Sequence, residues 1–173
     1  VIGLNLCPFA KAPHAKDQIH YAVCNGADAR DLLVALRAEL QALAVADPAA
    51  RETTLLMAPA LFAEFLDFND FLTDADTVLH DLALEGTLQI APLHPHFQFA
   101  GTASDDITNA TNRAPYPTLH LLREASIDRA VAAFPEAATI YEANMATLRK
   151  IGHDGWAMLD VGATERRTID PAR

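Results

Sequence analysis

Hydrophobic positions along the chain recur with two different periods, and these predict alternating strands and helices. Residues 18–23 alternate apolar and polar side chains, as in a half-buried strand, and the apolar run 53–58 is typical of a buried strand. Between them, leucines recur at steps of three and four residues and predict a helix that begins at the N-cap Asp28 and ends near Pro48. These leucines are Leu32, Leu33, Leu36, Leu40 and Leu43.

A second apolar stripe predicts a longer helix, ended by Gly86 as its C-cap, with a break near Thr73 or Asp74 as an alternative. The stripe consists of Leu61, Phe62, Phe65, Leu66, Leu72, Ala75, Leu79 and Leu82. One core stripe does not need four phenylalanines, so an exposed subset of them would mark an interface. The four are Phe62, Phe65, Phe68 and Phe71.

Two further strands are predicted at residues 87–93 and 118–123, and the connection between them is far longer than an ordinary loop. Within this long loop (residues 93–117), residues 104–106 predict the N-cap and first turn of a short helix. After the last strand, Ser126 is expected to cap one helix. Phe134-Pro135 then separates it from a final helix, which Gly152 ends.

The resulting order, β-α-β-α-β-(long loop)-β-α-α, predicts an α/β (or α+β) fold with a mixed four-stranded sheet covered by helices. The two βαβ units favour parallel neighbouring strands, and the fourth strand is expected to pair antiparallel to the third. We expect one globular domain over residues 1–160 and a polar C-terminal arm over residues 161–173.

Composition and charge exclude several classes of protein. With 51% hydrophobic and 21% charged residues among 173, the chain can form a core, which excludes a disordered or collagen-like protein. The net charge of −10 argues against a nucleic-acid partner, because phosphate binding needs surplus Lys and Arg. No apolar run approaches the ~20 residues that cross a bilayer, and the first residues do not resemble a signal peptide. Two cysteines fit a reducing compartment, so we expect a soluble, acidic, cytoplasmic protein without a membrane partner, and a homo-oligomer is left open.

The charge is concentrated between Asp28 and Glu85, where twelve Asp and Glu face three Arg. A site for an anion is therefore expected in the near-neutral remainder, and the long loop is its main candidate. His94 and His120 are candidate acid–base groups, and Arg113 and Arg123 are candidate anchors for a phosphate or carboxylate. Further candidate ligand-binding residues are Gln98, Asn109, Asn112 and Tyr116.

Each of these residues also has a structural interpretation. The long loop is equally compatible with a surface excursion packed by Phe97 and Phe99. Arg113 could pair with Asp105 or Asp106, and Arg123 with the neighbouring Glu124, so the choice depends on burial.

Cys7 is a candidate nucleophile. Pro8 is predicted to begin a helical turn, which places the Cys7 sulfur at a helix N-terminus where a thiolate is favoured. A buried, inert thiol is the alternative interpretation, and a Cys-Pro pair also occurs in haem-regulatory motifs.

Two other chemistries match short patterns. Residues 94–100 fit the His-x-His-x-Gln-x-x pattern of histidine-triad-like nucleotidylyltransferases, which requires an extended segment with His94, His96 and Gln98 on one face. A metal site formed by these histidines with His120 or Asp105 is the other, although no Cys-x-x-Cys or His-Glu-x-x-His motif supports it.

Three strings of residues carry a resemblance to a known family. They are GLNLCPFA at residues 3–10, HPHFQFAG at residues 94–101 and TNRAPYPTLHLLRE at residues 111–124. From Val1 to about Leu159 the chain resembles the bacterial domain-of-unknown-function family 1415. The resemblance implies no established activity, but it points to the long loop and to Cys7.

We therefore expect an enzyme that acts on a small anionic metabolite, bearing a phosphate or carboxylate, through a His/Arg/Asn site on residues 94–124. A non-catalytic binding or assembly module is the first alternative. The second is a metal- or haem-binding protein that uses Cys7 with His94 or His120. The sequence identifies no cofactor and does not decide whether the protein is an enzyme.

Overall fold

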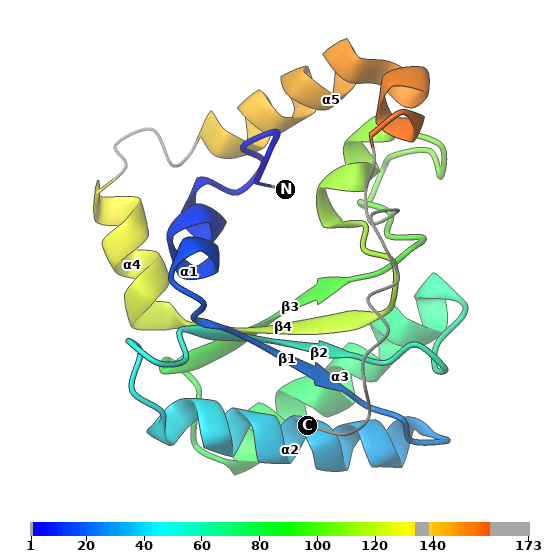
Figure 1. Ribbon diagram of the computed structural model, residues 1–173. Coiled ribbons are helices and arrows are strands. Elements are labelled where there is room, and N and C mark those ends of the chain that lie inside the picture. The colour runs from blue at the N-terminus through cyan, green and yellow to red at the C-terminus, as the bar shows by residue number, and fades with distance from the viewer. Residues whose placement is uncertain (1, 134–138, 160–173) are drawn as a thin grey trace, which may run out of the picture.

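Four strands form one mixed sheet in the order β1-β2-β4-β3 in the computed structural model, which describes residues 2–133 and 139–159 (Figure 1). The strands are β1 (Ile19–Val23), β2 (Thr53–Met57), β3 (Leu88–Leu93) and β4 (Thr118–Arg123). β1 and β2 are parallel, and β4 is antiparallel to both of its neighbours, β2 and β3. The predicted mixed sheet is confirmed, but the second βαβ unit joins strands that are not neighbours, because β4 lies between β2 and β3.

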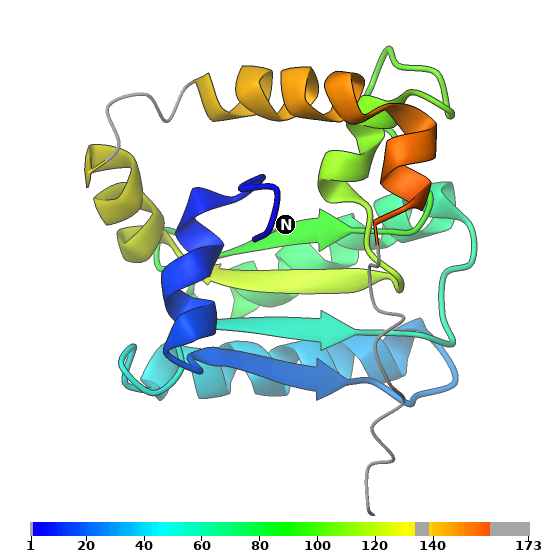
Figure 2. The ribbon, with the colours of Figure 1, turned by 45° about the horizontal axis from the view of Figure 1, so that its top comes forward.

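Helices lie on both sides of this sheet. α2 (Ala29–Val45) and α3 (Phe65–Asp81) cover one face (Figure 1). The other helices and helical turns of the described residues lie on the opposite side of the sheet (Figure 2). They are η1 (Pro8–Ala10), α1 (Lys11–Ala15), η2 (Ile107–Asn112), α4 (Glu124–Ala133) and α5 (Ile140–Ala157). None of the helices within the described ranges is both long and apolar enough to cross a membrane.

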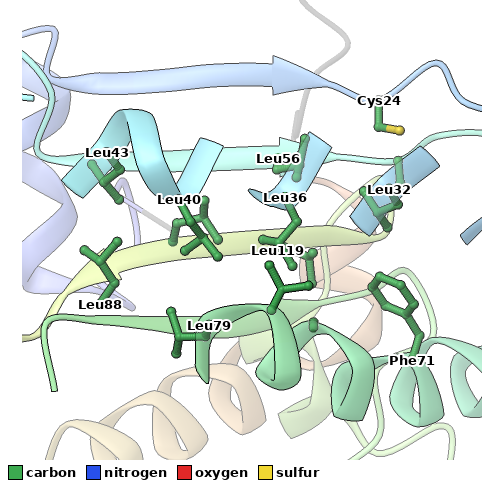
Figure 3. Packing of buried hydrophobic residues seen from close by; sticks show 14 of the residues in the cluster. Cys24, Leu32, Leu36, Leu40, Leu43, Leu56, Phe71, Leu79, Leu88 and Leu119 are labelled. Carbon is green, nitrogen blue, oxygen red and sulfur yellow. The ribbon is translucent and has the colours of Figure 1, made fainter. Parts of the chain in front are cut away.

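The main hydrophobic core lies between the sheet and the two long helices (Figure 3). Nine of its large side chains are at most 1% exposed: Leu32, Leu36, Leu40, Leu43, Leu56, Phe68, Leu88, Leu119 and Leu121. Burial of each such side chain contributes about 1.5–3 kcal/mol, so this layer supplies most of the apolar stabilisation. The leucine stripe predicted for α2 is confirmed, with Leu33 half-buried at its margin.

The predicted N-cap Asp28 is confirmed, and the short helix expected in the long loop is present but begins after residues 104–106, with Asp106 as its N-cap. The Asp28 carboxylate accepts the backbone N–H groups of Arg30 and Asp31 at the start of α2. In the same way, Asp106 accepts the N–H of Thr108 at the start of η2. Each carboxylate satisfies a donor that the first helical turn leaves unpaired.

The prediction for α3 is wrong at both ends. The helix begins at Phe65 rather than at Leu61, and it runs unbroken past Thr73 to Asp81. Gly86 is not its C-cap, because the chain already leaves the helix at Ala83, whose φ of 53° is left-handed. An alanine in this conformation is uncommon, so the glycine was the natural but wrong choice from sequence.

The predicted start of α4 is wrong, and the predicted role of Gly152 in α5 is confirmed. α4 begins at Glu124 directly after β4, so Ser126 does not cap it, and the Ser126 hydroxyl instead accepts a hydrogen bond from Arg129. Gly152, with a φ of 66°, ends the first straight part of α5 as predicted, and the helix then resumes up to Ala157. The predicted break at Phe134-Pro135 and the arm at 161–173 lie outside the described residues.

The strand side chains that face away from α2 and α3 define a second surface, here called the open face. Because side chains alternate along a strand, it consists of Ile19, Tyr21, Val23, Thr53, Leu55, Met57, Gln89, Ala91, Leu93, Thr118, His120 and Leu122. In the described part of the chain, none of these side chains belongs to a hydrophobic cluster, and Tyr21 and Val23 are 55% and 51% exposed. The main hydrophobic core therefore lies on the opposite face of the sheet, against α2 and α3.

Candidate functional site

His120 lies in the middle of the open face, opposite Leu55 of β2 and Ala91 of β3. Its Nε2 is 2.8 Å from the hydroxyl oxygen of Thr53, and this hydroxyl is 2.6 Å from the carbonyl oxygen of Leu121. A carbonyl oxygen only accepts, so the single hydroxyl proton of Thr53 points to Leu121, and Thr53 accepts the N–H of His120 Nε2. The neutral ring therefore carries its proton on Nε2 and a free lone pair on Nδ1.

The Nδ1 atom of His120 has no hydrogen-bond partner among the described residues. In that part of the chain, the one completely buried side-chain nitrogen or oxygen without a partner is Nε of Arg123, so Nδ1 of His120 is not completely buried. Burial of the ring lowers the pKa of His120 to about 4, because the charged form loses hydration. At neutral pH the open face thus presents one neutral imidazole with an available lone pair.

His94 is a structural residue by its contacts. Its ring is fully buried, and its Nε2 lies 2.8 Å from the carbonyl oxygen of Phe62, to which it donates. Its Nδ1 accepts the backbone N–H of His96 at 3.0 Å, and the ring stacks on Phe68 of α3. Burial lowers the pKa of His94 as well. With both nitrogens occupied and no exposure, His94 joins the segment before α3 to the long loop.

The structure does not bring His94 and His120 together. Leu93, the last residue of β3, is on the open face, so His94 points to the other side and packs on α3. Their separation by the sheet follows from strand alternation, which the sequence alone does not reveal until the strand end is known.

The extended geometry expected for residues 94–98 is wrong. The chain turns here, and the N–H of Phe97 donates to the carbonyl oxygen of His94 at 3.1 Å. His96 and Gln98 are exposed while His94 is buried, and the Gln98 amide donates to the carbonyl oxygen of Thr102. The three side chains do not share a face, so the match to the nucleotidylyltransferase pattern carries no site here.

Arg113 closes the long loop without an acidic partner. Its Nε and Nη2 donate to the carbonyl oxygens of Phe97 and Ser104, at 3.3 and 2.6 Å. The expected pairing with Asp105 or Asp106 is not formed. Nη1 makes no hydrogen bond to the described residues, so one edge of the guanidinium remains available to an acidic group.

Asn109 folds the long loop from inside. Its fully buried side chain accepts the N–H of Phe99 and the hydroxyl of Thr102, and donates to the carbonyl oxygen of Ala103. All of these contacts stay within the loop, so its polar groups are satisfied locally.

Asn112 and Tyr116 are also placed by the loop. The backbone carbonyl of Asn112 accepts the N–H of His94 at 3.2 Å. Tyr116 is 47% exposed, and its carbonyl oxygen accepts the hydroxyl of Thr118. The Tyr116 side chain is thus accessible near the start of β4.

Arg123 holds the end of α2 on the face opposite His120. Its Nη2 donates to three carbonyl oxygens, those of Leu43 at 2.7 Å, Ala46 at 2.8 Å and Arg51 at 3.1 Å. A cation at a helix C-terminus is stabilised by the partial negative charge of the last carbonyls. Arg123 makes no ion pair with Glu124, and the structure does not bring it together with Arg113 or His120.

Cys7 occupies the N-cap position of η1, and Pro8 opens that turn as predicted. The thiol is half-buried and makes no hydrogen bond to the described residues. The segment that carries it crosses on the open-face side of the sheet (Figure 2). Its neighbour Leu6 is buried against Ala110 of η2 and Leu148 of α5, which anchors this segment.

Two other expectations do not gain support. Among the residues that the structure describes, no group of three or more His, Cys, Asp or Glu side chains is arranged to hold a metal ion. None of the four phenylalanines of the α3 region is exposed: Phe68 and Phe71 are in the core, and Phe62 and Phe65 are half-buried in ring contacts.

A shallow groove of about 350 Å³ runs between α2 and α3, lined by residues such as Leu33, Val34 and Arg37. It contains no candidate residue, and its one ion pair joins Arg37 to Asp81 across the two helices. The open face, by contrast, holds the candidate residue His120, whose Nδ1 has no partner among the described residues.

Sequence reasoning missed Thr53, the residue that sets the tautomer of His120. The two are 67 positions apart, and only the antiparallel register of β2 and β4 makes them neighbours.

No curated protein and no solved structure matches this chain. The model of one family, described as a protein of unknown function (DUF1415), matches residues 1–158, and the chain belongs to that family.

Proposed function

We propose that this protein is an enzyme that acts on a small metabolite bound on the open face, where Nδ1 of His120 accepts a hydrogen bond or a proton from it. The observation that carries the proposal is the fixed tautomer of His120, which leaves Nδ1 unprotonated and without a partner among the described residues. The half-buried apolar side chains around the ring would exclude water from a bound molecule, which strengthens its polar contacts.

The metabolite is proposed to carry a phosphate or carboxylate, held by Arg113. Support comes from the free Nη1 edge of this guanidinium and from the position of Arg113 directly after η2, an element on the side of the sheet opposite α2 and α3 (Figure 2). A planar guanidinium with fixed donors fits both kinds of acidic group. Cys7 contributes a nucleophile in this proposal only if the bound molecule reaches its thiol.

The test is binding and turnover of hydroxylated acids, with 4-hydroxybenzoate and 3-hydroxybutyrate as first probes. We expect binding to perturb the amides of β2 and β4, and to weaken at least tenfold in His120→Gln and in Arg113→Gln. His14→Gln is the matched control, because His14 is an exposed histidine on α1. Equal affinity in all three variants would overturn the proposal.

A non-catalytic assembly module is the second candidate, favoured by one observation. Tyr21 and Val23 are more than half exposed on β1, which is an edge strand. Exposed apolar side chains on a strand edge are a common basis for pairing with another chain. Sedimentation of the purified protein tests this, and a monomer at all concentrations counts against it.

A further inference from the structure

The polar groups at the centre of the open face have their hydrogens turned away from any bound molecule. The Thr53 hydroxyl donates to the Leu121 carbonyl, and the Thr118 hydroxyl donates to the Tyr116 carbonyl at 2.8 Å. His120 donates through Nε2 to Thr53. What these three side chains retain are lone pairs, and the one on Nδ1 of His120 has no hydrogen-bond partner among the described residues.

The same face contains no charged side chain. Its twelve residues include no Asp, Glu, Lys or Arg, and most are aliphatic or aromatic. An anion placed beside His120 would meet the lone pairs of His120, Thr53 and Thr118 with no cationic side chain among the twelve residues, and an ammonium group would lose its hydration with no carboxylate to replace it. A neutral group with an O–H or N–H bond, in contrast, can donate a hydrogen bond to these lone pairs without bringing a charge to the face.

We propose that the ligand of the open face ends in a neutral hydrogen-bond donor, a hydroxyl or an N–H on an apolar body, which donates to Nδ1 of His120. This inference rests on the proposed function and names the substrate group at that site. Any acidic group of the same molecule lies at its other end, outside the twelve residues of the open face.

The experiment compares probes of nearly equal size that differ in one property: phenol carries a neutral donor, fluorobenzene carries none, and benzoate carries an anion. The full chain is labelled with ¹⁵N, so that backbone amides of β2 and β4 report binding and the His120 ring nitrogens report the contact. We expect phenol to bind about fivefold more tightly than fluorobenzene, as one added hydrogen bond predicts, and to shift the Nδ1 resonance. Benzoate is expected to leave that resonance unchanged.

Two variants keep the test independent of folding defects. His120→Phe keeps an aromatic ring without the acceptor, so the preference for phenol over fluorobenzene should disappear. Thr53→Val leaves His120 intact but removes the hydroxyl that fixes its proton, so the preference should shrink as both tautomers become populated. His14→Phe is the control and should keep the full preference.

The outcomes separate this inference from the proposed function. Equal binding of phenol and fluorobenzene on β2 and β4, or tighter binding of benzoate there with a shifted His120 ring, would overturn the donor preference and leave the site standing. If none of the probes, including 4-hydroxybenzoate, perturbs these strands, both proposals fail. A preference that survives in His120→Phe would also overturn the inference.

Discussion

At the residue scale, His94 and His120 differ in what remains for a ligand. Both ring nitrogens of His94 form hydrogen bonds to backbone groups, Nε2 to the Phe62 carbonyl and Nδ1 to the His96 N–H. In His120 only Nε2 has a partner among the described residues, and Nδ1 has none. The sequence makes both histidines candidate acid–base groups, but we expect their substitution to have different effects. Substituting His94 should lower stability, and substituting His120 should remove the proposed ligand contact.

Replacing His94 with alanine should lower the free energy of unfolding by about 2–5 kcal/mol, because a buried ring is lost and a buried carbonyl is left without its donor. Phe62, which supplies that carbonyl, has a left-handed φ of 54° that its neighbours must support. Urea denaturation measures the change. His96→Ala, at an exposed ring two residues on, is the control and should stay within about 0.5 kcal/mol. Equal effects of the two substitutions would contradict the role given to His94.

Buried neutral histidines also make stability depend on pH. In the unfolded chain an imidazole takes up a proton below about pH 6.5, whereas folded His120 does so only near its lowered pKa of about 4. Protons therefore favour the unfolded state between these values, and His120 should account for a loss on the order of 2 kcal/mol between pH 8 and pH 5. His94, whose pKa burial also lowers, adds to the same trend.

The measurement is a set of urea transitions from pH 8 to pH 4.5 on the parent chain and on His120→Gln. The variant should show a flatter decline than the parent over this range, since its side chain does not titrate. Parallel curves would mean that folding does not lower the pKa of His120.

At the element scale, Arg123 connects β4 to the end of α2 by donating to three carbonyl oxygens. Arg123→Met should lower the free energy of unfolding by about 2–3 kcal/mol, because charge-assisted hydrogen bonds and the favourable charge at the helix terminus are lost together. Arg30→Met, on the exposed first turn of the same helix, is the control. Phenol binding on the open face should be unchanged in Arg123→Met, because this guanidinium lies on the other side of the sheet.

The elements themselves were accessible to prediction because each follows from a local pattern. The leucine steps of α2 and its Asp28 cap lie within one stretch of chain, and both were found. The ends of α3 and α4 were missed because Ala83 adopts a conformation that glycine normally takes, and because β4 passes into α4 with no intervening cap.

The candidate site was predicted less well, for a different reason. The long loop does contain polar residues, but the side chain of Asn109 and the Nε and Nη2 atoms of Arg113 form hydrogen bonds to backbone groups of the loop itself. Which backbone groups a loop leaves unpaired is decided by its fold, not by composition. The partner that matters for His120 comes from another strand, through a register that no local pattern contains.

At the scale of the whole molecule, the residues that the structure describes form two hydrophobic clusters of unequal size, and the open face belongs to neither. The large one lies between the sheet and α2 and α3. The small one consists of Leu6, Ala110 and Leu148, flanked by Leu4, Ile107 and Trp156, and it joins the N-terminal segment to η2 and α5. Asn144 adds a buried hydrogen bond from α5 to the carbonyl oxygen of Leu6. We infer two units of different local stability, since few buried contacts support the second.

Leu148→Ala and Leu36→Ala should therefore behave differently, although both remove a fully buried leucine. Leu36→Ala should cost about 2–5 kcal/mol of global stability and speed amide exchange throughout the sheet. Leu148→Ala should speed exchange in η2, α5 and residues 4–7 while β2 and β4 keep their protection, because the small cluster opens without the large one. Hydrogen exchange resolved by residue distinguishes the two. Loss of protection in β2 and β4 of Leu148→Ala, to the same degree as in α5, would mean that the two clusters unfold as one.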